Sequence, residues 1–395
     1  MSVNPSLLDW KFVILLAVVG LLRRFVPQRF YVAFGAASSA ALVGLAAPQT
    51  LLVIAGVTLL YVYPLHRLMW AARERGYSQA MLRWFLGLGI SGLVAILILF
   101  KLYRQFTVPW LGGPWIAPQV LALVGFSYFI FRAISFLHIQ AILKIDERRP
   151  WVLLWYTLFP PTITSGPIQK YQDFRQQVAA PMPLDRSLAL TAAYRVTRGY
   201  FRKAVVAFVL NEAVTRVLAA SQLTIVTSIF AIVLLYLYFY FDFAGYSDIA
   251  IGFGLLMGIK VPENFRKPFL ATTVSEFWRN WHITLVDWFR DHVFIPFGGM
   301  QASRTKAAAL AFVIMVLCGL WHGLTFGLLA WGAWHGLLLL SEGLSGSRPV
   351  PPALRHGLKY WSRVLWTNAR VAFPCIFFLP ASDMTLKVFR GFVNW

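Results

Sequence analysis

Long apolar segments alternate with short basic stretches along most of the chain. Segments of this length and apolarity are typical of helices that cross a membrane, each of which needs ~20 residues. Residues 224–258 form an apolar run about twice that length, so we expect two helices there. The other predicted spans are residues 7–22, 31–46, 51–64, 81–100, 118–143, 307–319, 324–340 and 361–379. Together they predict an all-α polytopic membrane protein with about 10–12 membrane helices.

Residues 151–219 depart from this pattern because prolines interrupt them and basic residues are frequent. The prolines are Pro160, Pro161, Pro167, Pro181 and Pro183. Proline cannot continue an α-helix, so short interfacial or re-entrant helices are expected here. Elsewhere, arginines follow the first, third and fifth spans, and cytoplasmic loops are enriched in Lys and Arg. This rule places those loops inside and the N-terminus outside.

Composition agrees with a membrane protein, since 59% of the 395 residues are hydrophobic and only 13% are charged. The formal net charge of +21 would suggest nucleic acid as the partner of a soluble protein. Because the basic residues lie between apolar spans, topology and contact with anionic lipid explain most of the excess, and no nucleic-acid partner is expected. An acidic protein at the cytoplasmic face is a further expected partner.

Two sequence features exclude other classes. Cys318 and Cys375 lie in apolar stretches and form no metal-ligand or disulfide pattern, so no metal site is predicted. The first apolar segment has no basic n-region and no small-residue cleavage site, so we expect it to be a retained span rather than a signal peptide.

The most unusual polar residue is His322, in the sequence GLWHG at residues 319–323. The surrounding residues 307–340 contain no Asp, Glu, Lys or Arg. An imidazole at membrane depth is costly unless a polar partner or a water-filled cavity satisfies it, and it can exchange a proton near neutral pH. Catalysis is one interpretation. Helix packing is the other, because Gly319 and Gly323 have the small-xxx-small spacing of close helix contacts.

A second histidine, His282, lies in a segment rich in charge and tryptophan. We predict a helix over residues 276–292, with a polar stripe on one side and His282 on the aromatic-lined other side. A functional proton-exchanging group and a tolerated histidine in an amphipathic helix are both open interpretations. Among the other histidines, we expect His66 and His356 at the surface. We expect His138 and His335 to be packed in the core and bonded to an oxygen. The position of His292 is ambiguous.

Two acids, Asp242 and Asp248, lie near the expected break in residues 224–258. Ionisable residues inside a membrane are functional candidates by default, although pairing with an arginine or capping a broken helix would give them a structural role. Cys318 lies one turn before His322 and could form a thiol–imidazole pair, but a small packed residue is the simpler interpretation. The proline-rich turn around Ser165 is expected to shape a channel.

Three stretches together resemble the membrane-bound O-acyltransferase (MBOAT) superfamily. They are FPPTITSGPIQKYQDF at residues 159–174, YFDFAGYSDIAIGFGLLMGIKVPENFRKPFLATTVSEFWRNWH at 240–282, and GLWHG at 319–323 followed by WHG at 334–336. Within it the chain is similar to D-alanyl transfer proteins (DltB) and to alginate O-acetylation proteins (AlgI). GFSYFIFR at 125–132 and WFRD at 288–291 are closer to the D-alanyl branch, which is favoured. IPFGG at 295–299 and WGAWHG at 331–336 are closer to the alginate branch.

The resemblance implies a ring of membrane helices around a thin centre that a tunnel crosses. It divides the single membrane domain into N-terminal helices (residues 1–143), a catalytic core (144–342) and a linker with a C-terminal helix (343–395). It implies that His322 is catalytic and that His282 is the second functional histidine. The substrate-tunnel candidates are Trp278, Asn280, Trp281, Trp321, Asp242, Tyr246, Asp248 and Ser165.

The implied reaction moves an acyl group, D-alanyl in the favoured branch, across the bacterial cytoplasmic membrane to a hydroxyl of an envelope polymer or of an acyl-accepting protein outside. The donor is a phosphopantetheine thioester on a small acidic carrier protein, or acyl-CoA, and no bound cofactor is expected. Acetyl transfer to an exopolysaccharide is the alternative within the family. Outside it, the alternatives are a proton-coupled transporter or flippase that uses the same histidines and acids, and a non-catalytic scaffold.

Overall fold

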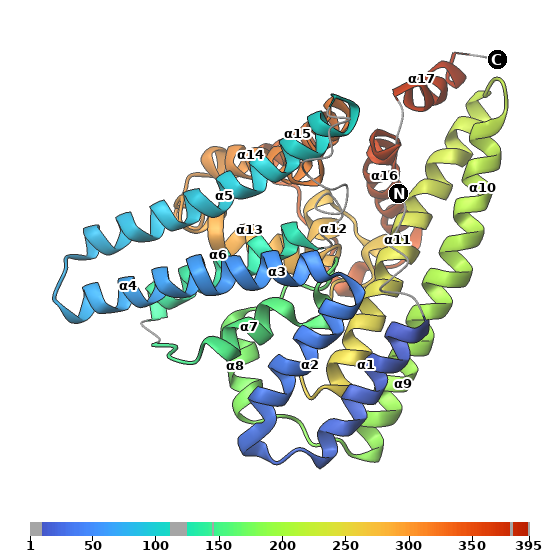
Figure 1. Ribbon diagram of the computed structural model, residues 1–395. Coiled ribbons are helices and arrows are strands. Elements are labelled where there is room, and N and C mark those ends of the chain that lie inside the picture. Colours follow the sequence, from blue (N-terminus) through green and yellow to red (C-terminus); the bar gives the residue numbers. More distant parts are fainter. Residues whose placement is uncertain (1–9, 111–124, 144–145, 380–381, 394–395) are drawn as a thin grey trace. The chain divides into compact units, whose positions relative to one another are not determined.

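The computed structural model describes residues 10–110, 125–143, 146–379 and 382–393 (Figure 1). The regular elements named in those ranges are helices, with one isolated antiparallel β-bridge between Phe265 and Trp281. The chain divides into two compact units, Met1–Val196 with Ile249–Pro262 and Thr197–Asp248 with Glu263–Trp395. The prediction of an all-α protein is confirmed for the described ranges.

The first unit contains the N-terminal helices. They are α1 (Trp10–Leu22), α2 (Tyr31–Ala46), α3 (Pro48–Val57), α4 (Tyr63–Glu74), α5 (Gln79–Trp110), α6 (Phe126–Leu143), α7 (Pro150–Leu158) and α8 (Tyr171–Ala179). A π-helical turn over Thr58–Val62 joins α3 and α4 into one run. The core of this unit is aromatic, since Trp155, Tyr156, Tyr171 and Phe174 are buried and meet edge to face.

Helix α11 (Ile225–Leu256) is continuous over 32 residues, so the predicted break near Asp242 and Asp248 is wrong. A helix can hold two acids in an apolar stretch when cations neutralise them. The cations come from one neighbouring run, in which Lys203 pairs with Asp242, and Arg198 and Arg202 pair with Asp248.

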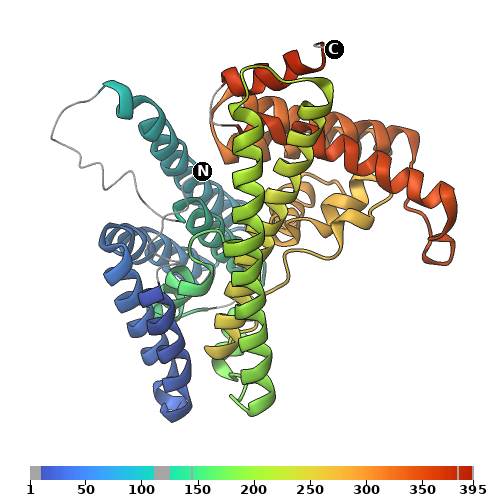
Figure 2. The same cartoon turned by 90° about the vertical axis from the view of Figure 1, so that its right-hand side faces the viewer.

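The neighbouring run is also continuous, from α9 (Arg186–Tyr200) through a π-helical stretch (Phe201–Ala207) to α10 (Phe208–Ala219). Figure 2 shows it in green as one long helix beside α11. The predicted short helices are therefore confined to residues before 186, because the helix-breaking prolines end at Pro183. Gly245 of α11 permits the contact, since a Cβ there would lie 2.8 Å from the carbonyl oxygen of Gly199.

The second unit continues after α11 with α12 (Val274–Asn280), α13 (Ile283–Phe289), a π-helical turn (Arg290–Phe294), α14 (Arg304–His322), α15 (Phe326–Ser345), α16 (Gly357–Ala372), a 3₁₀ stretch (Phe373–Phe378) and α17 (Ser382–Gly391). Helices α14 and α15 form a hairpin with glycines at its contact. A Cβ at Gly319 would lie 2.3 Å from the carbonyl oxygen of Leu328, and one at Gly332 would lie 2.5 Å from that of Met315. The close contact predicted from Gly319 is therefore present.

Five helices among the described residues are long and apolar enough to cross a membrane. They are Gln28–Ala46, Pro48–Glu74, Gln79–Tyr103, Ile225–Leu256 and Arg304–His322. This supports the prediction of a polytopic membrane protein. The predicted spans at 7–22 and 118–143 begin outside the described residues, as does the N-terminus, whose side of the membrane stays a prediction.

Candidate active site

His322 is the last residue of α14, where the chain turns toward α15. The backbone N–H of Gly323 donates to the carbonyl oxygen of Gly319 (3.2 Å) and ends the helix. Thr325 then caps α15, because its hydroxyl oxygen accepts from the N–H of Leu328 (3.3 Å). The apolar hairpin therefore ends in a short polar corner that carries the imidazole.

Three aromatic rings surround the imidazole of His322. Its centroid lies 4.7 Å from that of Trp321, 5.3 Å from that of Trp331 and 5.1 Å from that of Phe378. Trp331 belongs to α15 and Phe378 to the 3₁₀ stretch, so three elements contribute. His322 is nevertheless exposed. The rings position the imidazole while leaving it accessible to a reagent.

The structure corrects the prediction of one helix over residues 276–292. Helix α12 ends at Asn280, Trp281 is extended and pairs with Phe265, and α13 begins at Ile283. His282 lies at the break with φ 46° and ψ 49°, a left-handed conformation that is uncommon for residues other than glycine. The sequence pattern does not show this break, because the residues on both sides have helical periodicity.

His282 is buried, with 4% of its surface exposed, and its Nδ1 lies 3.3 Å from Oδ1 of Asn264. The same oxygen accepts from the hydroxyl (2.7 Å) and the backbone N–H (3.3 Å) of Thr284. Because Oδ1 is an acceptor, Nδ1 of His282 is the donor, and Nε2 of the neutral ring carries the lone pair. Sequence analysis did not single out Asn264, although it lies inside the quoted 240–282 motif.

Aromatic contacts connect the two histidines. The ring of His282 lies 4.6 Å from that of Phe243 and 6.5 Å from that of Trp321, which in turn contacts His322. Burial, and secondarily the charge of His322, hold the pKa of His282 well below its ordinary value. His282 is therefore neutral at physiological pH. We call His282, Trp321, His322, Trp331 and Phe378 the aromatic–histidine site.

A buried carboxylate anchors the start of α12, the helix that leads to His282. Glu342 of α15 accepts hydrogen bonds from the backbone N–H groups of Val274 (2.8 Å) and Ser275 (3.0 Å) and pairs with Arg370 (3.4 Å). The first N–H groups of a helix lack intrahelical partners and favour negative charge. Sequence analysis missed Glu342, although a lone acid in an apolar helix is a signal that could have found it.

Two further buried polar side chains adjoin the aromatic–histidine site. The ring of His335 lies 4.8 Å from that of Trp331 and 5.0 Å from that of Trp278. Nδ1 of His335 and Nε1 of Trp278 have no hydrogen-bond partner among the described residues. His335 is packed as predicted, but its Nδ1 does not make the expected bond to an oxygen.

All of these side chains lie within residues 147–380, which match a family model described as MBOAT, membrane-bound O-acyltransferase family. The chain belongs to this family.

Similar proteins within the family carry two kinds of name. A probable alginate O-acetylase AlgI of Pseudomonas aeruginosa is 32% identical over 315 residues, 77% of this chain and 59% of that protein. A teichoic acid D-alanyltransferase of Streptococcus thermophilus is 30% identical over 353 residues, 85% of this chain and 82% of that protein. A second such transferase, of Bacillus subtilis, is 31% identical over 232 residues, 56% of this chain and 59% of that protein.

The chain spans less than two thirds of the length of the AlgI relatives that it matches. Because the identities to acetylases and to D-alanyltransferases are similar, the branch of the family stays a prediction.

In this acyltransferase-family chain, Asp242 and Asp248 pair with cations, and their role as tunnel residues stays a prediction. Arg202 Nη1 lies 2.7 Å and Arg198 Nε 2.9 Å from Oδ2 of Asp248, and Lys203 donates to Asp242. A proton relay through either acid would first have to break these ion pairs. This weakens the transporter alternative.

The remaining tunnel candidates lie in several different elements. The ring of Trp281 stacks on that of Phe277 at 5.3 Å. The side-chain amide of Asn280 donates to the carbonyl oxygen of Glu276 (2.8 Å). Tyr246 is half-buried in α11, and Ser165 is half-buried in the first unit. Their roles as tunnel residues stay predictions.

One histidine prediction is wrong. His66, expected at the surface, is only 3% exposed, and its Nε2 accepts from the backbone N–H of Glu147 (3.3 Å). Its basic sequence neighbours suggested a surface loop, whereas it lies within α4. His356 is exposed as predicted. The ambiguous His292 stacks on Trp288, with a ring distance of 4.6 Å.

Proposed function

We propose that this chain transfers an acyl group from a thioester to a hydroxyl, with His322 as the general base. One observation carries the proposal: an exposed imidazole, His322, stands among aromatic rings beside a second histidine, His282, that burial keeps neutral. Membership of the O-acyltransferase family supports the same reaction class.

In the proposed reaction, His322 takes the proton of the acceptor hydroxyl as the hydroxyl oxygen attacks the thioester carbonyl carbon. A C–O bond forms, the C–S bond breaks, and the proton passes from His322 to the leaving thiolate. A positioned base of this kind typically contributes ~10²–10⁴-fold to the rate.

His282 has a narrower proposed role. Because its Nδ1 donates to Asn264, its Nε2 can accept a hydrogen bond but cannot donate one while the ring is neutral. Stabilising a developing oxyanion needs a donor, and the single proton of the attacking hydroxyl goes to His322, so Nε2 of His282 would accept from a second O–H or N–H group of the acceptor molecule. The tautomer therefore favours orientation of the acceptor over oxyanion stabilisation.

The finer assignment is D-alanyl transfer from the phosphopantetheine arm of an acidic carrier protein, which basic cytoplasmic loops would dock. The acceptor would be an envelope polymer or an intermediary protein on the outer side. Donor and acceptor would meet through a tunnel in a thin centre within a ring of about 10–12 membrane helices. The AlgI-like alternative is acetyl transfer to an exopolysaccharide.

The test is a purified-protein assay with labelled D-alanyl and acetyl thioesters, each offered on a phosphopantetheine carrier protein and as a small thiol ester. His322→Ala should lower thioester consumption by about 10²-fold or more while the protein still accumulates in the membrane. His356→Ala, which removes an exposed linker histidine, is the matched control and should retain the rate. A His322→Ala rate equal to wild type would remove His322 from the base role. The preferred label decides between D-alanyl and acetyl.

A further inference from the structure

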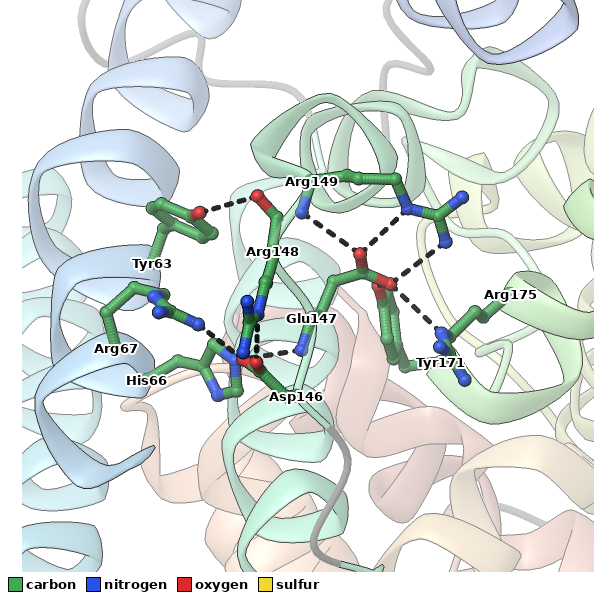
Figure 3. A network of polar contacts seen from close by, with 9 residues as sticks. All are labelled: Tyr63, His66, Arg67, Asp146, Glu147, Arg148, Arg149, Tyr171 and Arg175. Carbon is green, nitrogen blue, oxygen red and sulfur yellow. Dashed lines mark hydrogen bonds and ion pairs between the residues drawn. The ribbon is translucent and has the colours of Figure 1, made fainter. Parts of the chain in front are cut away.

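Four arginines converge on two adjacent carboxylates in the first unit (Figure 3). We call Arg67, Asp146, Glu147, Arg148, Arg149 and Arg175 the arginine cluster. Asp146 pairs with Arg67 and Arg148. Glu147 pairs with Arg149 and Arg175, each at 3.0 Å. Residues from α4, the segment before α7, and α8 therefore meet at one point.

In the arginine cluster Glu147 is buried, Asp146 is half-buried, and the guanidinium groups are more exposed than either acid. The side chain of Glu147 is 2% exposed and that of Asp146 is 13% exposed. The arginine side chains are between 37% and 72% exposed. The acids therefore form the floor of the cluster, and the cations form its accessible surface.

The acids stay ionised at neutral pH. Burial alone would raise the pKa of Glu147, but hydrogen bonds from Arg149 and from the hydroxyl of Tyr171 (2.8 Å) outweigh it and bring the pKa below its ordinary value. Four guanidinium charges on two carboxylate charges leave a net charge of +2 (4 − 2). The ion pairs with Glu147 and Asp146 hold this charge in place, unlike that of a mobile surface arginine.

Exposed apolar side chains lie close in the sequence to residues of the arginine cluster. Leu68, which follows Arg67 in the candidate membrane span Pro48–Glu74, is 54% exposed, and Leu60 of the same span is 82% exposed. Trp151, two residues after Arg149, is 58% exposed. Exposed leucines on a membrane span face acyl chains, and tryptophan is enriched at the level of the head groups. The sequence neighbours of the cluster are therefore of the kind expected where a membrane span meets the head groups.

We propose that the arginine cluster binds the phosphate of an anionic phospholipid head group at the membrane interface. Guanidinium groups donate paired N–H bonds in a geometry that matches phosphate oxygens. Basic sites between membrane helices recognise anionic head groups in this way. The adjoining leucines and tryptophan favour a lipid over an acidic protein, because a bound lipid places its chains against them. This site is independent of acyl transfer.

The experiment titrates the detergent-purified full chain with phosphatidylglycerol or phosphatidylcholine and counts bound lipids by native mass spectrometry. The double variant Arg148→Gln/Arg175→Gln removes one cation from each acid, so that each carboxylate keeps one partner. We expect about thirtyfold weaker binding of phosphatidylglycerol, with binding of phosphatidylcholine unchanged. Should the double variant fold poorly, Arg148→Gln alone, at a 72% exposed side chain, should weaken binding about fivefold.

The matched control is Arg216→Gln/Arg290→Gln, which removes two charges from exposed arginines in the second unit. It should bind phosphatidylglycerol as wild type does. Equal binding by wild type and the cluster variant would overturn the proposal, as would equal loss in the control, which would indicate only overall charge. If the cluster variant keeps phosphatidylglycerol but loses an acidic carrier protein, the surface docks protein and the lipid assignment is wrong.

Discussion

The aromatic–histidine site and the arginine cluster bury titratable groups in opposite ways. His282 is surrounded by aromatic rings, with the amide oxygen of Asn264 as the partner of its Nδ1, and burial keeps it neutral. Glu147 is equally buried but stays charged, because Arg149, Arg175 and Tyr171 all donate to it. Burial keeps His282 uncharged, whereas hydrogen bonds from its neighbours keep Glu147 ionised.

This difference indicates which region can do chemistry. A neutral imidazole can take up and release a proton near neutral pH. A carboxylate that accepts from two guanidinium groups and a phenol is a poor base, because a proton would have to displace them. The comparison therefore favours our proposal of proton transfer at the histidines over a role of the carboxylates as bases.

The largest stability effect should come from Glu147→Ala. It leaves the hydroxyl of Tyr171, which is 0% exposed, without an acceptor, whereas Arg149 and Arg175 can turn toward water. We expect the free energy of unfolding to fall by about 3 kcal/mol. The measurement is the monodisperse fraction that remains after heating in detergent, calibrated by denaturant unfolding.

The control for this variant is Glu74→Ala. Glu74 is exposed and accepts from Nε1 of Trp70 (2.8 Å), so the same substitution removes a charge without leaving a buried group unsatisfied. It should change stability by no more than about 0.5 kcal/mol. Comparable losses in both variants would contradict the view that the cluster depends on its buried acids.

As the pH falls, His282 should become protonated before Glu147 does. The pKa of His282 is lowered on folding, so its contribution is complete above the unfolded value of about 6.5 and is lost as the pH falls below it. This loss grows as the pH falls from 6.5 toward the lowered pKa of the folded state. The pKa of Glu147 is also lowered, but from a carboxyl value, so its contribution is lost only below about pH 4.3.

The measurement compares heat stability at pH 7.5 and pH 5 for wild type and His282→Asn. Asparagine tolerates the left-handed backbone at this position and does not titrate. The variant should lose less stability between the two pH values than wild type, and the difference isolates His282 from other buried histidines. Identical pH dependence in the two proteins would mean that His282 is not held neutral by burial.

Sequence reasoning succeeded where the information is local. The apolar runs predicted a helix over residues 31–46 and the two helices on either side of His322, because continuous apolarity needs no distant partner to be recognised. The family motifs were equally readable, and the family model matches the region that contains them.

It failed where a residue's state depends on a distant partner. His66 looked like a loop residue beside Arg67, but Glu147, 81 positions away, supplies the N–H that it accepts. The predicted break at Asp242 did not allow for Lys203, which neutralises the acid within a continuous helix. The left-handed His282 is likewise held by Asn264, 18 positions earlier.

The smallest predicted effect compares one buried hydroxyl in each region. Tyr171→Phe removes a hydrogen bond to a charged acceptor, Glu147, and should cost about 2 kcal/mol. Thr284→Val removes a bond of 2.7 Å to the neutral amide oxygen of Asn264 and should cost about 1 kcal/mol. Both hydroxyl groups are buried, and their acceptors differ in charge. If heat stability fell more in Thr284→Val than in Tyr171→Phe, the charge of the acceptor would not be what distinguishes the two regions. A larger loss in Tyr171→Phe than in Thr284→Val would mean that the two regions differ because Glu147 is ionised and Asn264 is neutral.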